Sequence, residues 1–337
     1  MMSDRDWIQR TIEHEETGAV PYNFMFSPPA RCLAEEHYGT ALEDRISLPL
    51  RMIGPKSIKP LYADPDCYGD TISDEFGVVW STSKIDRGSP IGPCLPEPDL
   101  AKYVFPDPAK ESRFSGLGDW LAQQEGHYRI VWVGDLWERA TFMRGMEFIL
   151  LDLIMNPSFV AELLEKLTEH ILETMRIVIG TGRLEGIAVS DDYGAQRGML
   201  MSPAHWRNFV KPCLARIYGL AKSHGLAVFH HSCGNIVPII GDMIDLGLDI
   251  LHPIQPEAMD ILSLKKEFGK HLAFCGGVRT QDLLVSGTPQ EVRHEVQRLK
   301  REMSAGGGYI LEPGITIQAD VPGENLIALI DEARQRE

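Results

Sequence analysis

Short apolar runs alternate with longer amphipathic segments along the second half of the chain. The runs predict strands at residues 226–231, 249–255, 272–278 and 308–313. The segments between and after them predict helices at 236–246, 261–268, 289–303 and 324–334. Strand and helix in strict alternation are typical of a parallel sheet with right-handed crossovers.

The same alternation of predicted strands and helices continues in the earlier part of the chain. Strands are expected at 129–134 and 186–191, long helices at 157–179 and 203–223, and a first strand at 20–25. One further strand is expected between residues 53 and 80. About eight strands in this order favour a (β/α)₈ TIM barrel. A doubly wound open sheet is the competing topology, but it usually carries an early G-x-G-x-x-G or a P-loop, which this sequence lacks.

Residues 55–118 interrupt the alternation because proline and glycine are dense there. Within them, residues 70–83 predict two short strands around a turn. We therefore expect one domain over residues 1–337, with an insertion at about 55–118 that covers one end of the barrel.

Composition narrows the class of partner. The chain has 337 residues, and its formal net charge of −15 disfavours nucleic acid and anionic membranes. No stretch approaches the roughly 20 apolar residues of a membrane span. Six cysteines without a framework pattern indicate reduced thiols. The expected location is the cytoplasm.

The most informative motif is His231-Ser232-Cys233, which follows the predicted strand 226–231. In an extended backbone, residues two apart point to the same side. An imidazole and a thiol can then meet at one point, as two ligands of zinc do. The alternative is a buried thiol beside a hydrogen-bonded histidine.

Polar residues also end the other predicted strands. Strand ends build the active site of a TIM barrel. Cys275 and Glu312 are candidate metal ligands, although Cys275 suits a buried apolar role and Glu312 an ion pair with arginine. Asp191 and Asp192 should point to opposite faces, so only one enters the barrel mouth. The remaining candidates are Asn23, Tyr193, His252 and Gln255.

These residues carry a resemblance to the uroporphyrinogen decarboxylase superfamily, and within it to the corrinoid-dependent methyltransferase branch. The matching text is Asp191-Asp192-Tyr193-Gly194-x-Gln196, Met201-Ser202-Pro203, His231-Ser232-Cys233-Gly234, Pro253-x-Gln255, Gly276-Gly277-Val278 and Pro322-x-Glu324-Asn325. The resemblance implies a (β/α)₈ fold and zinc on His-x-Cys. The decarboxylases open with an arginine-containing segment that holds porphyrinogen carboxylates, whereas residues 21–26 here contain no arginine.

One departure concerns the third zinc ligand. Methyltransferases of this branch that act on thiols have a second cysteine near the last strand, where this sequence has Glu312-Pro313-Gly314. The expected zinc ligands are thus His231 and Cys233, with Cys275 or Glu312 as a substitute. A site with fewer thiolates is a stronger Lewis acid, which suits an ether oxygen better than a thiol.

The expected function is methyl transfer between a small methylated substrate and the cobalt of a corrinoid on a separate protein. A methoxylated aromatic or other methyl ether is the first candidate, and a methylamine or thiol is an alternative. Asp192 or Glu312 would donate a proton or bind the metal. The expected substrate contacts are Asn23, Asp191, Tyr193, His252 and Gln255. A metal-free decarboxylase and a non-catalytic corrinoid-binding barrel are the other candidate functions.

Overall fold

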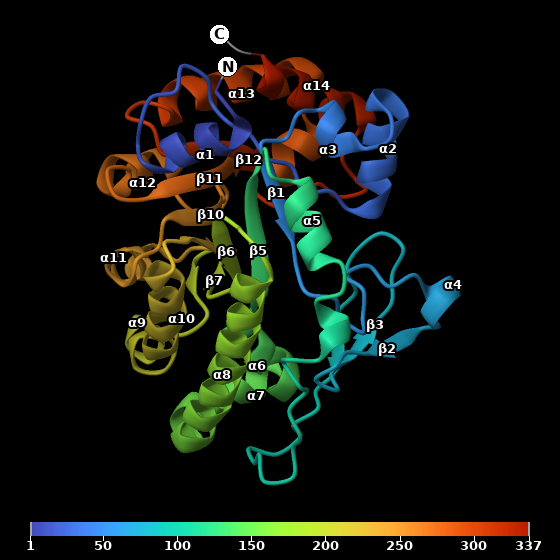
Figure 1. Ribbon diagram of the computed structural model, residues 1–337, viewed down its shortest axis with the longest axis vertical. Coiled ribbons are helices and arrows are strands. Elements are labelled where there is room, and N and C mark those ends of the chain that lie inside the picture. Colours follow the sequence, from blue (N-terminus) through green and yellow to red (C-terminus); the bar gives the residue numbers. More distant parts are fainter. Residues whose placement is uncertain (1, 336–337) are drawn as a thin grey trace.

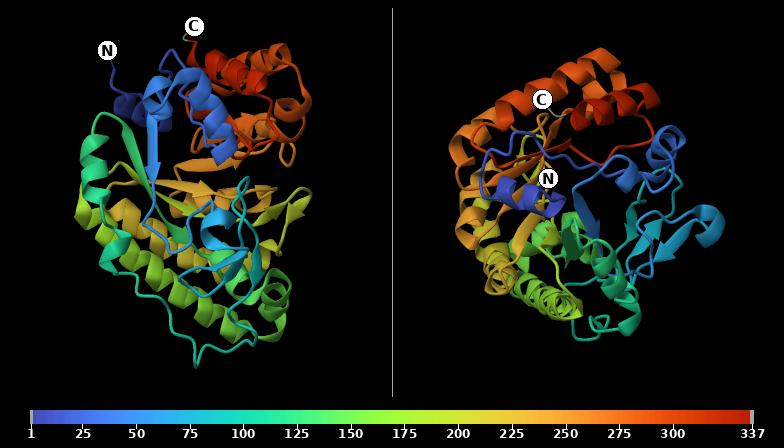
Figure 2. Two further views of the ribbon diagram at one scale, coloured as in Figure 1. Left: turned by 90° about the vertical axis from the view of Figure 1, so that its right-hand side faces the viewer. Right: turned by 45° about the horizontal axis from the view of Figure 1, so that its top comes forward.

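Parallel strands form one strongly curled sheet at the centre of the molecule (Figures 1 and 2). This computed structural model describes residues 2–335, and within them the main sheet has seven strands. Their spatial order is β1 (Leu50–Ile53), β5 (Tyr128–Asp135), β6 (Gly186–Ser190), β9 (Ala227–His231), β10 (Ile250–Ile254), β11 (Ala273–Val278) and β12 (Tyr309–Pro313). Every neighbouring pair is parallel. The expected TIM-barrel class is confirmed.

The eighth position of the barrel is held by a segment that forms only isolated bridges. Residues 20–25, expected as the first strand, pair with β12 through Tyr22 and Leu311 alone. The Asn23 amide donates to the Leu311 carbonyl at 2.9 Å, and the Leu311 amide donates to that of Pro21 at 2.8 Å. The backbone thus runs parallel to β12 over one pair of hydrogen bonds. It is too short for a strand because Pro21 has no amide hydrogen to extend the ladder.

Strand β1 lies outside the window predicted for it. It occupies Leu50–Ile53 and pairs with β5 from Leu50 to Ile53, whereas the sequence placed a barrel strand between residues 53 and 80. Only four residues long, β1 stands between Pro49 and the irregular segment that begins with Gly54-Pro55. Such a short apolar run gives little periodic signal, which explains the error.

Helices follow most of the strands and pack around the sheet (Figures 1 and 2). They are α2 (Pro28–Tyr38), α3 (Leu42–Arg45), α5 (Leu117–Gln123), α6 (Trp137–Arg144), α7 (Met146–Met155), α8 (Pro157–Thr181), α9 (Pro203–His205), α10 (Lys211–Ser223), α11 (Val237–Leu246), α12 (Ile261–Phe268), α13 (Pro289–Met303) and α14 (Gly323–Arg334), with single turns η1 (Glu111–Arg113), η2 (Trp206–Val210) and η3 (Thr280–Leu284). A capping box between Thr288 and Glu291 begins α13 where the sequence predicted it. No helix within residues 2–335 is long and apolar enough to cross a membrane.

Inward-facing side chains fill the amino-terminal part of the barrel with a small apolar core. This core comprises Ile8, Leu50, Tyr128, Ile130, Ala188, Phe229, Ile250, Ala273, Cys275 and Ile310. Ile8 comes from α1 (Asp4–Ile12), which packs across the barrel end opposite the site and contacts β1, β5 and β12. Alternate residues of each strand face inward. The inward-facing side chains two residues further along each strand therefore line the carboxyl-terminal mouth.

The insertion covers that mouth beside β5. It contains α4 (Pro65–Tyr68) and an antiparallel sheet of β2 (Thr71–Ser73), β3 (Val79–Ser81) and β4 (Pro90–Gly92). The two short strands predicted within residues 70–83 are confirmed as β2 and β3. Arg139 on α6 binds Asp74 at 2.6 Å and packs over the Phe76 ring at 4.6 Å. These contacts fix the insertion against the barrel.

We predict that Ile8→Ala lowers the free energy of unfolding by about 2–4 kcal/mol, because the fully buried Ile8 closes one end of the barrel core. Urea unfolding followed by circular dichroism measures the change. The exposed neighbour Gln9 provides the control, and Gln9→Ala should change stability by less than about 0.5 kcal/mol. Equal effects of the two substitutions would contradict this role for α1.

Candidate metal centre and adjoining pocket

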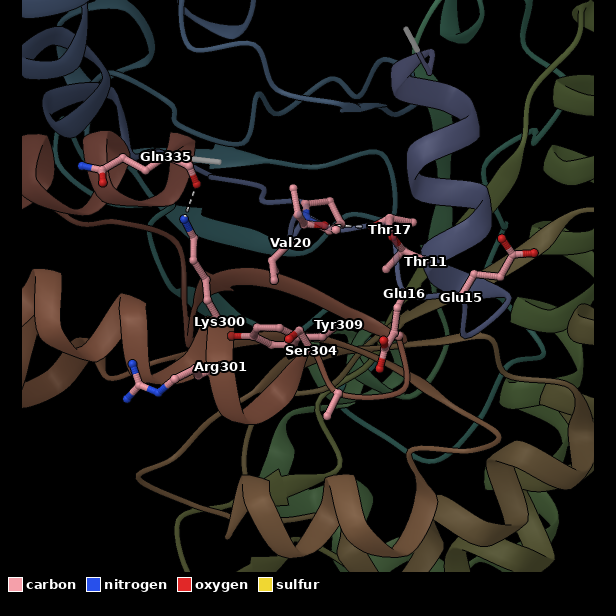
Figure 3. A pocket seen from close by; sticks show the side chains of 15 residues that line it. Thr11, Glu15, Glu16, Thr17, Val20, Lys300, Arg301, Ser304, Tyr309 and Gln335 are labelled. Carbon is pink, nitrogen blue, oxygen red and sulfur yellow. Dashed lines mark hydrogen bonds between the residues drawn. The ribbon is translucent and has the colours of Figure 1, made fainter. Parts of the chain in front are cut away.

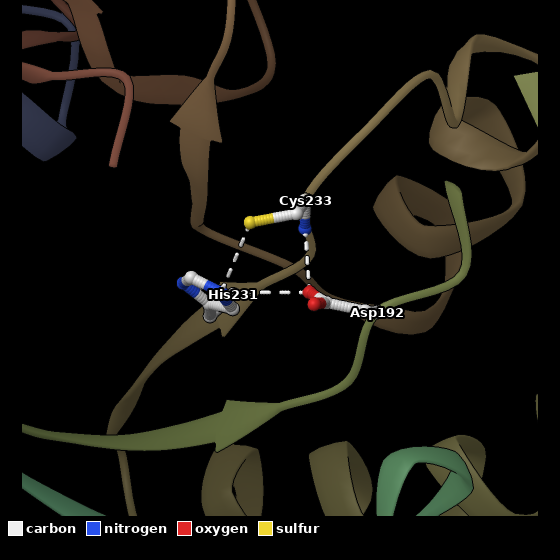
Figure 4. Close-up of side chains that lie close together, drawn as sticks. All are labelled: Asp192, His231 and Cys233. Atoms are coloured by element: carbon white, nitrogen blue, oxygen red, sulfur yellow. Dashed lines mark hydrogen bonds and ion pairs between the residues drawn. The ribbon is translucent and has the colours of Figure 1, made fainter. Parts of the chain in front are cut away.

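Three potential ligands meet where β6 and β9 end (Figure 4). His231 is the last residue of β9, Cys233 follows two residues later, and Asp192 follows β6. The His231 Nε2 atom lies 3.5 Å from Cys233 Sγ and 3.5 Å from Asp192 Oδ1. The Cys233 amide donates to Asp192 Oδ1 at 2.8 Å, which fixes the carboxylate beside the thiol. We call Asp192, His231 and Cys233 the outer cluster.

A second set of potential ligands lies deeper in the barrel. His252 on β10, Cys275 on β11 and Glu312 on β12 point into the interior and are at most 1% exposed. Glu312 Oε2 lies 3.5 Å from His252 Nε2, accepts from Cys275 Sγ at 3.0 Å and accepts from Asn23 Nδ2 at 3.0 Å. We call His252, Cys275 and Glu312 the inner cluster. The expected ligand set of His231, Cys233, Cys275 and Glu312 is therefore divided between two clusters.

A single contact between imidazoles joins the two clusters. The Nδ1 atoms of His231 and His252 are 2.9 Å apart, so one proton must lie between them. If Nε2 of His231 binds a metal, its Nδ1 keeps the proton and donates it to His252. His252 then carries its own proton on Nε2, directed at Glu312. Two neutral imidazoles cannot both use Nε2 as a metal ligand here, because both Nδ1 atoms would then be protonated.

Neighbouring charges and burial set the pKa values of the groups in the two clusters. Burial works against a charged His231, but Cys233 and Asp192 raise its pKa well above the usual value. Burial also works against Asp192, but the hydrogen bond to His231 lowers its pKa to about 2. Despite complete burial, His252 lowers the pKa of Glu312. Both carboxylates are thus ionised at neutral pH, which suits acceptors or ligands better than proton donors.

Burial itself sets the pKa values of the other two inner-cluster groups. It lowers the pKa of His252, and it raises that of the Cys275 thiol well above the usual value, helped by Glu312. A neutral His252 and a protonated Cys275 are both suited to donate to the Glu312 carboxylate. The inner cluster therefore contains one anion and its donors.

Two of the expected substrate-binding residues lie behind the mouth. Asp191 and Tyr193 are fully buried, and the Tyr193 hydroxyl donates to Asp191 at 2.8 Å. The other Asp191 oxygen accepts from the amides of Leu136 and Glu138, each at 2.8 Å, and so anchors the start of α6. Gln255 holds the turn after β9, since its amide oxygen accepts from Gly234 at 2.6 Å. Substrate contact by these residues stays a prediction.

A cavity of about 400 Å³ adjoins the outer cluster between the insertion, β5, α6 and α8. Ser190 in its wall is the register partner of His231, and the Trp132 ring lies 6.4 Å from the His231 ring. Its aromatic walls are Phe76, Trp80, Trp132 and Phe142. A volume of this size suits a small organic molecule.

Two further lining residues carried no signal in the sequence. Arg113 belongs to η1 in the insertion, and His170 lies on the inner face of α8 at 8% exposure. Burial, then the charges of Arg113 and Arg139, lower the pKa of His170 to about 4, while the Pro106 carbonyl opposes the shift. From the sequence, a histidine in the middle of an amphipathic helix is interpreted as a packing residue. Only the fold shows that His170 faces a cavity.

A second cavity, of about 310 Å³, lies at the opposite end of the strands (Figure 3). It is lined by the loop after α1, the end of α13 and the turn before β12, including Thr11, Glu16, Ser304 and Gly307. Lys300 beside it donates to the carbonyls of Glu332 and Gln335. Catalytic groups in TIM barrels cluster at the carboxyl-terminal face, so this cavity lies at the end associated with stability.

The fold and the site define this protein as a TIM barrel that carries a cysteine, histidine and carboxylate cluster at its mouth. The uroporphyrinogen decarboxylase (URO-D) family model matches residues 129–336, and the chain belongs to that family. A uroporphyrinogen decarboxylase from Psychromonas ingrahamii is 23% identical over 262 residues, covering 71% of this chain and 70% of that protein. One from Thermus thermophilus is 29% identical over 175 residues, covering 50% and 46%.

Among solved structures, a methyltransferase from Methanosarcina mazei superposes with a TM-score of 0.74. The alignment covers 99% of this chain and 98% of that one at 19% identity. At that identity the likeness establishes the shared fold over the whole length, including the insertion.

We predict that acid weakens the fold partly through His170. Its folded pKa of about 4 lies below the usual 6.5, so the unfolded chain binds the proton first and stability falls as pH drops from 6.5 towards 4. Between pH 7.5 and 5 the loss from this group is about 2 kcal/mol. Urea unfolding of the wild type and His170→Phe at both pH values measures it. The variant should lose less stability than the wild type, and an identical pH dependence would refute the assignment.

Proposed function

We propose that this protein transfers a methyl group from a small methyl ether to the cobalt of a corrinoid bound on a separate protein. The observation that carries the proposal is the outer cluster, a thiol, an imidazole and an ionised carboxylate at the carboxyl ends of barrel strands. In the proposed reaction the carbon–oxygen bond breaks with its electron pair going to oxygen. Co(I) supplies the pair that forms the carbon–cobalt bond, and the alcohol or phenol product takes a proton from solvent.

The outer cluster fits zinc. Cysteine, histidine and carboxylate are common zinc ligands, and three protein ligands leave the fourth position open, as in catalytic zinc sites. His231, Cys233 and Asp192 would hold the ion, and their potential ligand atoms already lie within 4.8 Å of one another. Zinc there supplies Lewis acidity towards the ether oxygen, which makes that oxygen a better leaving group.

The chain's own residues orient and shield that centre. His252 Nδ1 would accept the His231 Nδ1 proton, and its Nε2 lies 3.5 Å from Glu312 Oε2, an arrangement suited to fixing the ring of a metal-binding histidine. Gln255 Nε2 lies 3.7 Å from Cys233 Sγ and steadies the sulfur. With a substrate bound, the aromatic walls of the adjoining cavity would displace water from it, so that polarisation of the substrate would act in a lower dielectric.

A decarboxylase of the porphyrinogen type is the second candidate, favoured by the sequence relatives. Such a substrate carries many carboxylates and needs many free cations. The adjoining cavity is lined by four cations and four carboxylates. Three ion pairs, Arg139 with Asp74 and Asp135 and Arg87 with Glu138, neutralise much of that charge. This balance favours the methyltransferase.

The first test of the function is metal content together with turnover. Protein purified without chelators should hold about one zinc per chain by elemental analysis and form methylcobalamin from Co(I) cobalamin and a methoxylated aromatic. Cys233→Ser should lose most of both while keeping the wild-type circular dichroism spectrum. Methyl transfer retained in Cys233→Ser would refute the zinc mechanism.

A second test separates the two clusters. We predict that His252→Gln lowers zinc affinity by about tenfold or more, because His231 loses the partner that fixes its ring. Cys275→Ser is the matched control. It keeps a donor to Glu312 and should change zinc affinity by less than about twofold, since Cys275 belongs to the inner cluster. Competition with a chromophoric chelator measures both. Strong loss of zinc in Cys275→Ser would mean that Cys275 is a ligand.

A further inference from the structure

Buried nitrogens that make no hydrogen bond of acceptable geometry gather at one end of the cavity beside the outer cluster. Within the described chain, Nε of Arg113 and both ring nitrogens of His170 are buried and make no hydrogen bond of acceptable geometry. Arg113 Nη1 donates to the Pro108 carbonyl at 2.6 Å and to Thr174 Oγ1 at 3.3 Å. Leaving a buried polar group unsatisfied costs about as much as a lost hydrogen bond, so such a cluster is expected to serve a ligand.

The charges of the cavity leave two of its lining cations without an ion pair. Among residues 2–335, Arg113 and Lys59 have no carboxylate within ion-pair distance, whereas Arg87 and Arg139 do. Lys59 donates to the carbonyls of Pro60, Leu61 and Arg87. The remaining lining carboxylate, Glu75, accepts from Ser57 at 2.5 Å. Two cations thus face one carboxylate that is already hydrogen-bonded.

The lowered pKa values of Arg113 and His170 also indicate a positive electrostatic potential around these two residues. Burial lowers the pKa of Arg113, opposed by the more distant Glu75 and Asp107, as expected for a cation that has lost water without gaining a carboxylate partner. The lowered pKa of His170 leaves it neutral at pH 7, with one N–H to donate.

The two ends of the cavity present different chemistry. Trp132 and Ser190 line it next to His231, whereas Arg113 and His170 come from η1 and α8 outside the barrel. Phe76 also lines the cavity, and its ring packs 5.1 Å from that of His170 and beneath Arg139. A flat apolar molecule with an anionic group at one end matches this arrangement.

We infer that the cavity binds the carboxylate of an aromatic acid on Arg113 and His170, and that the methyl donor is a methoxylated aromatic acid whose methoxy group faces the outer cluster. The choice of methyl donor depends on the proposed methyltransferase function, whereas the carboxylate site does not. Arg113 supplies the charge, neutral His170 supplies an N–H, and the aromatic walls contact the ring. Guanidinium is well suited to carboxylate because its donors are arranged as a fork.

The test uses probes without a methyl group, so that binding is measured apart from turnover. Isothermal titration of the full-length protein with benzoate and with benzamide compares the anion with its neutral isostere. Benzoate should bind roughly tenfold to a hundredfold more tightly, the range for a hydrogen bond to a charged group. Equal affinity for the two probes would overturn the carboxylate site.

Variants locate the site. Arg113→Gln and His170→Phe should each weaken benzoate binding about tenfold and leave benzamide binding unchanged. Arg183→Gln, which removes an exposed arginine between α8 and β6, is the matched control and should bind both probes like the wild type. Benzoate binding unaffected in both pocket variants, or weakened equally in Arg183→Gln, would overturn the assignment.

Two further readouts separate this role from a structural one and from binding by the metal. His170→Phe removes two unsatisfied buried nitrogens, so its urea midpoint at pH 7.5 should equal or exceed that of the wild type although its benzoate affinity falls. Cys233→Ser should bind benzoate like the wild type. Loss of benzoate binding in Cys233→Ser alone would place the carboxylate on the metal and overturn the proposal. Benzoate binding without demethylation of 4-methoxybenzoate would leave the carboxylate site standing and count against the proposed function.

Discussion

The contact between His231 and His252 is the constraint on which the site depends. With 2.9 Å between two Nδ1 atoms, one proton lies between them, and the imidazole that carries this proton is the one that can use Nε2 as a ligand. His231 faces Cys233 and Asp192 at the mouth, and His252 faces the ionised Glu312 in the interior. The outer cluster can then bind a metal while the inner cluster anchors it. Glu312 acts through His252 in this arrangement.

The barrel explains why these groups meet. Five neighbouring segments, from β6 through β12, end at one face, and residues spaced by two along each strand point into the same interior. Apolar side chains fill the end closed by Ile8, and the polar groups follow one repeat later. The insertion then places Arg139 and Phe76 over β5 and encloses a cavity beside the metal ligands.

Much of this arrangement could be predicted from the sequence, because periodicity is strong where strands are buried on both faces. The strands that carry His231, His252, Cys275 and Glu312 lie where the apolar runs indicated. Strand β1 was misplaced, and the segment at Tyr22 lies where it was expected but forms a bridge instead of a strand, since both are short and flanked by proline.

Spacing alone could not separate one ligand set into two. The depth of a residue along its strand decides whether the side chain reaches the mouth or stays in the interior. The pattern of apolar and polar residues does not encode that depth. Cys233 lies beyond the end of β9, whereas Cys275 lies within β11, so the two thiols are at different depths. Arg113 and His170 were missed for a related reason, because an unsatisfied donor is visible only when its surroundings are known.

X-ray absorption at the zinc edge of the zinc-loaded protein tests the central claim most directly. A metal on His231, Cys233 and Asp192 predicts one sulfur at about 2.3 Å together with nitrogen and oxygen ligands at about 2.0–2.2 Å. Two sulfurs in the first shell would require Cys275 to join Cys233. That result would contradict the division of the site into an outer cluster that binds and an inner cluster that orients.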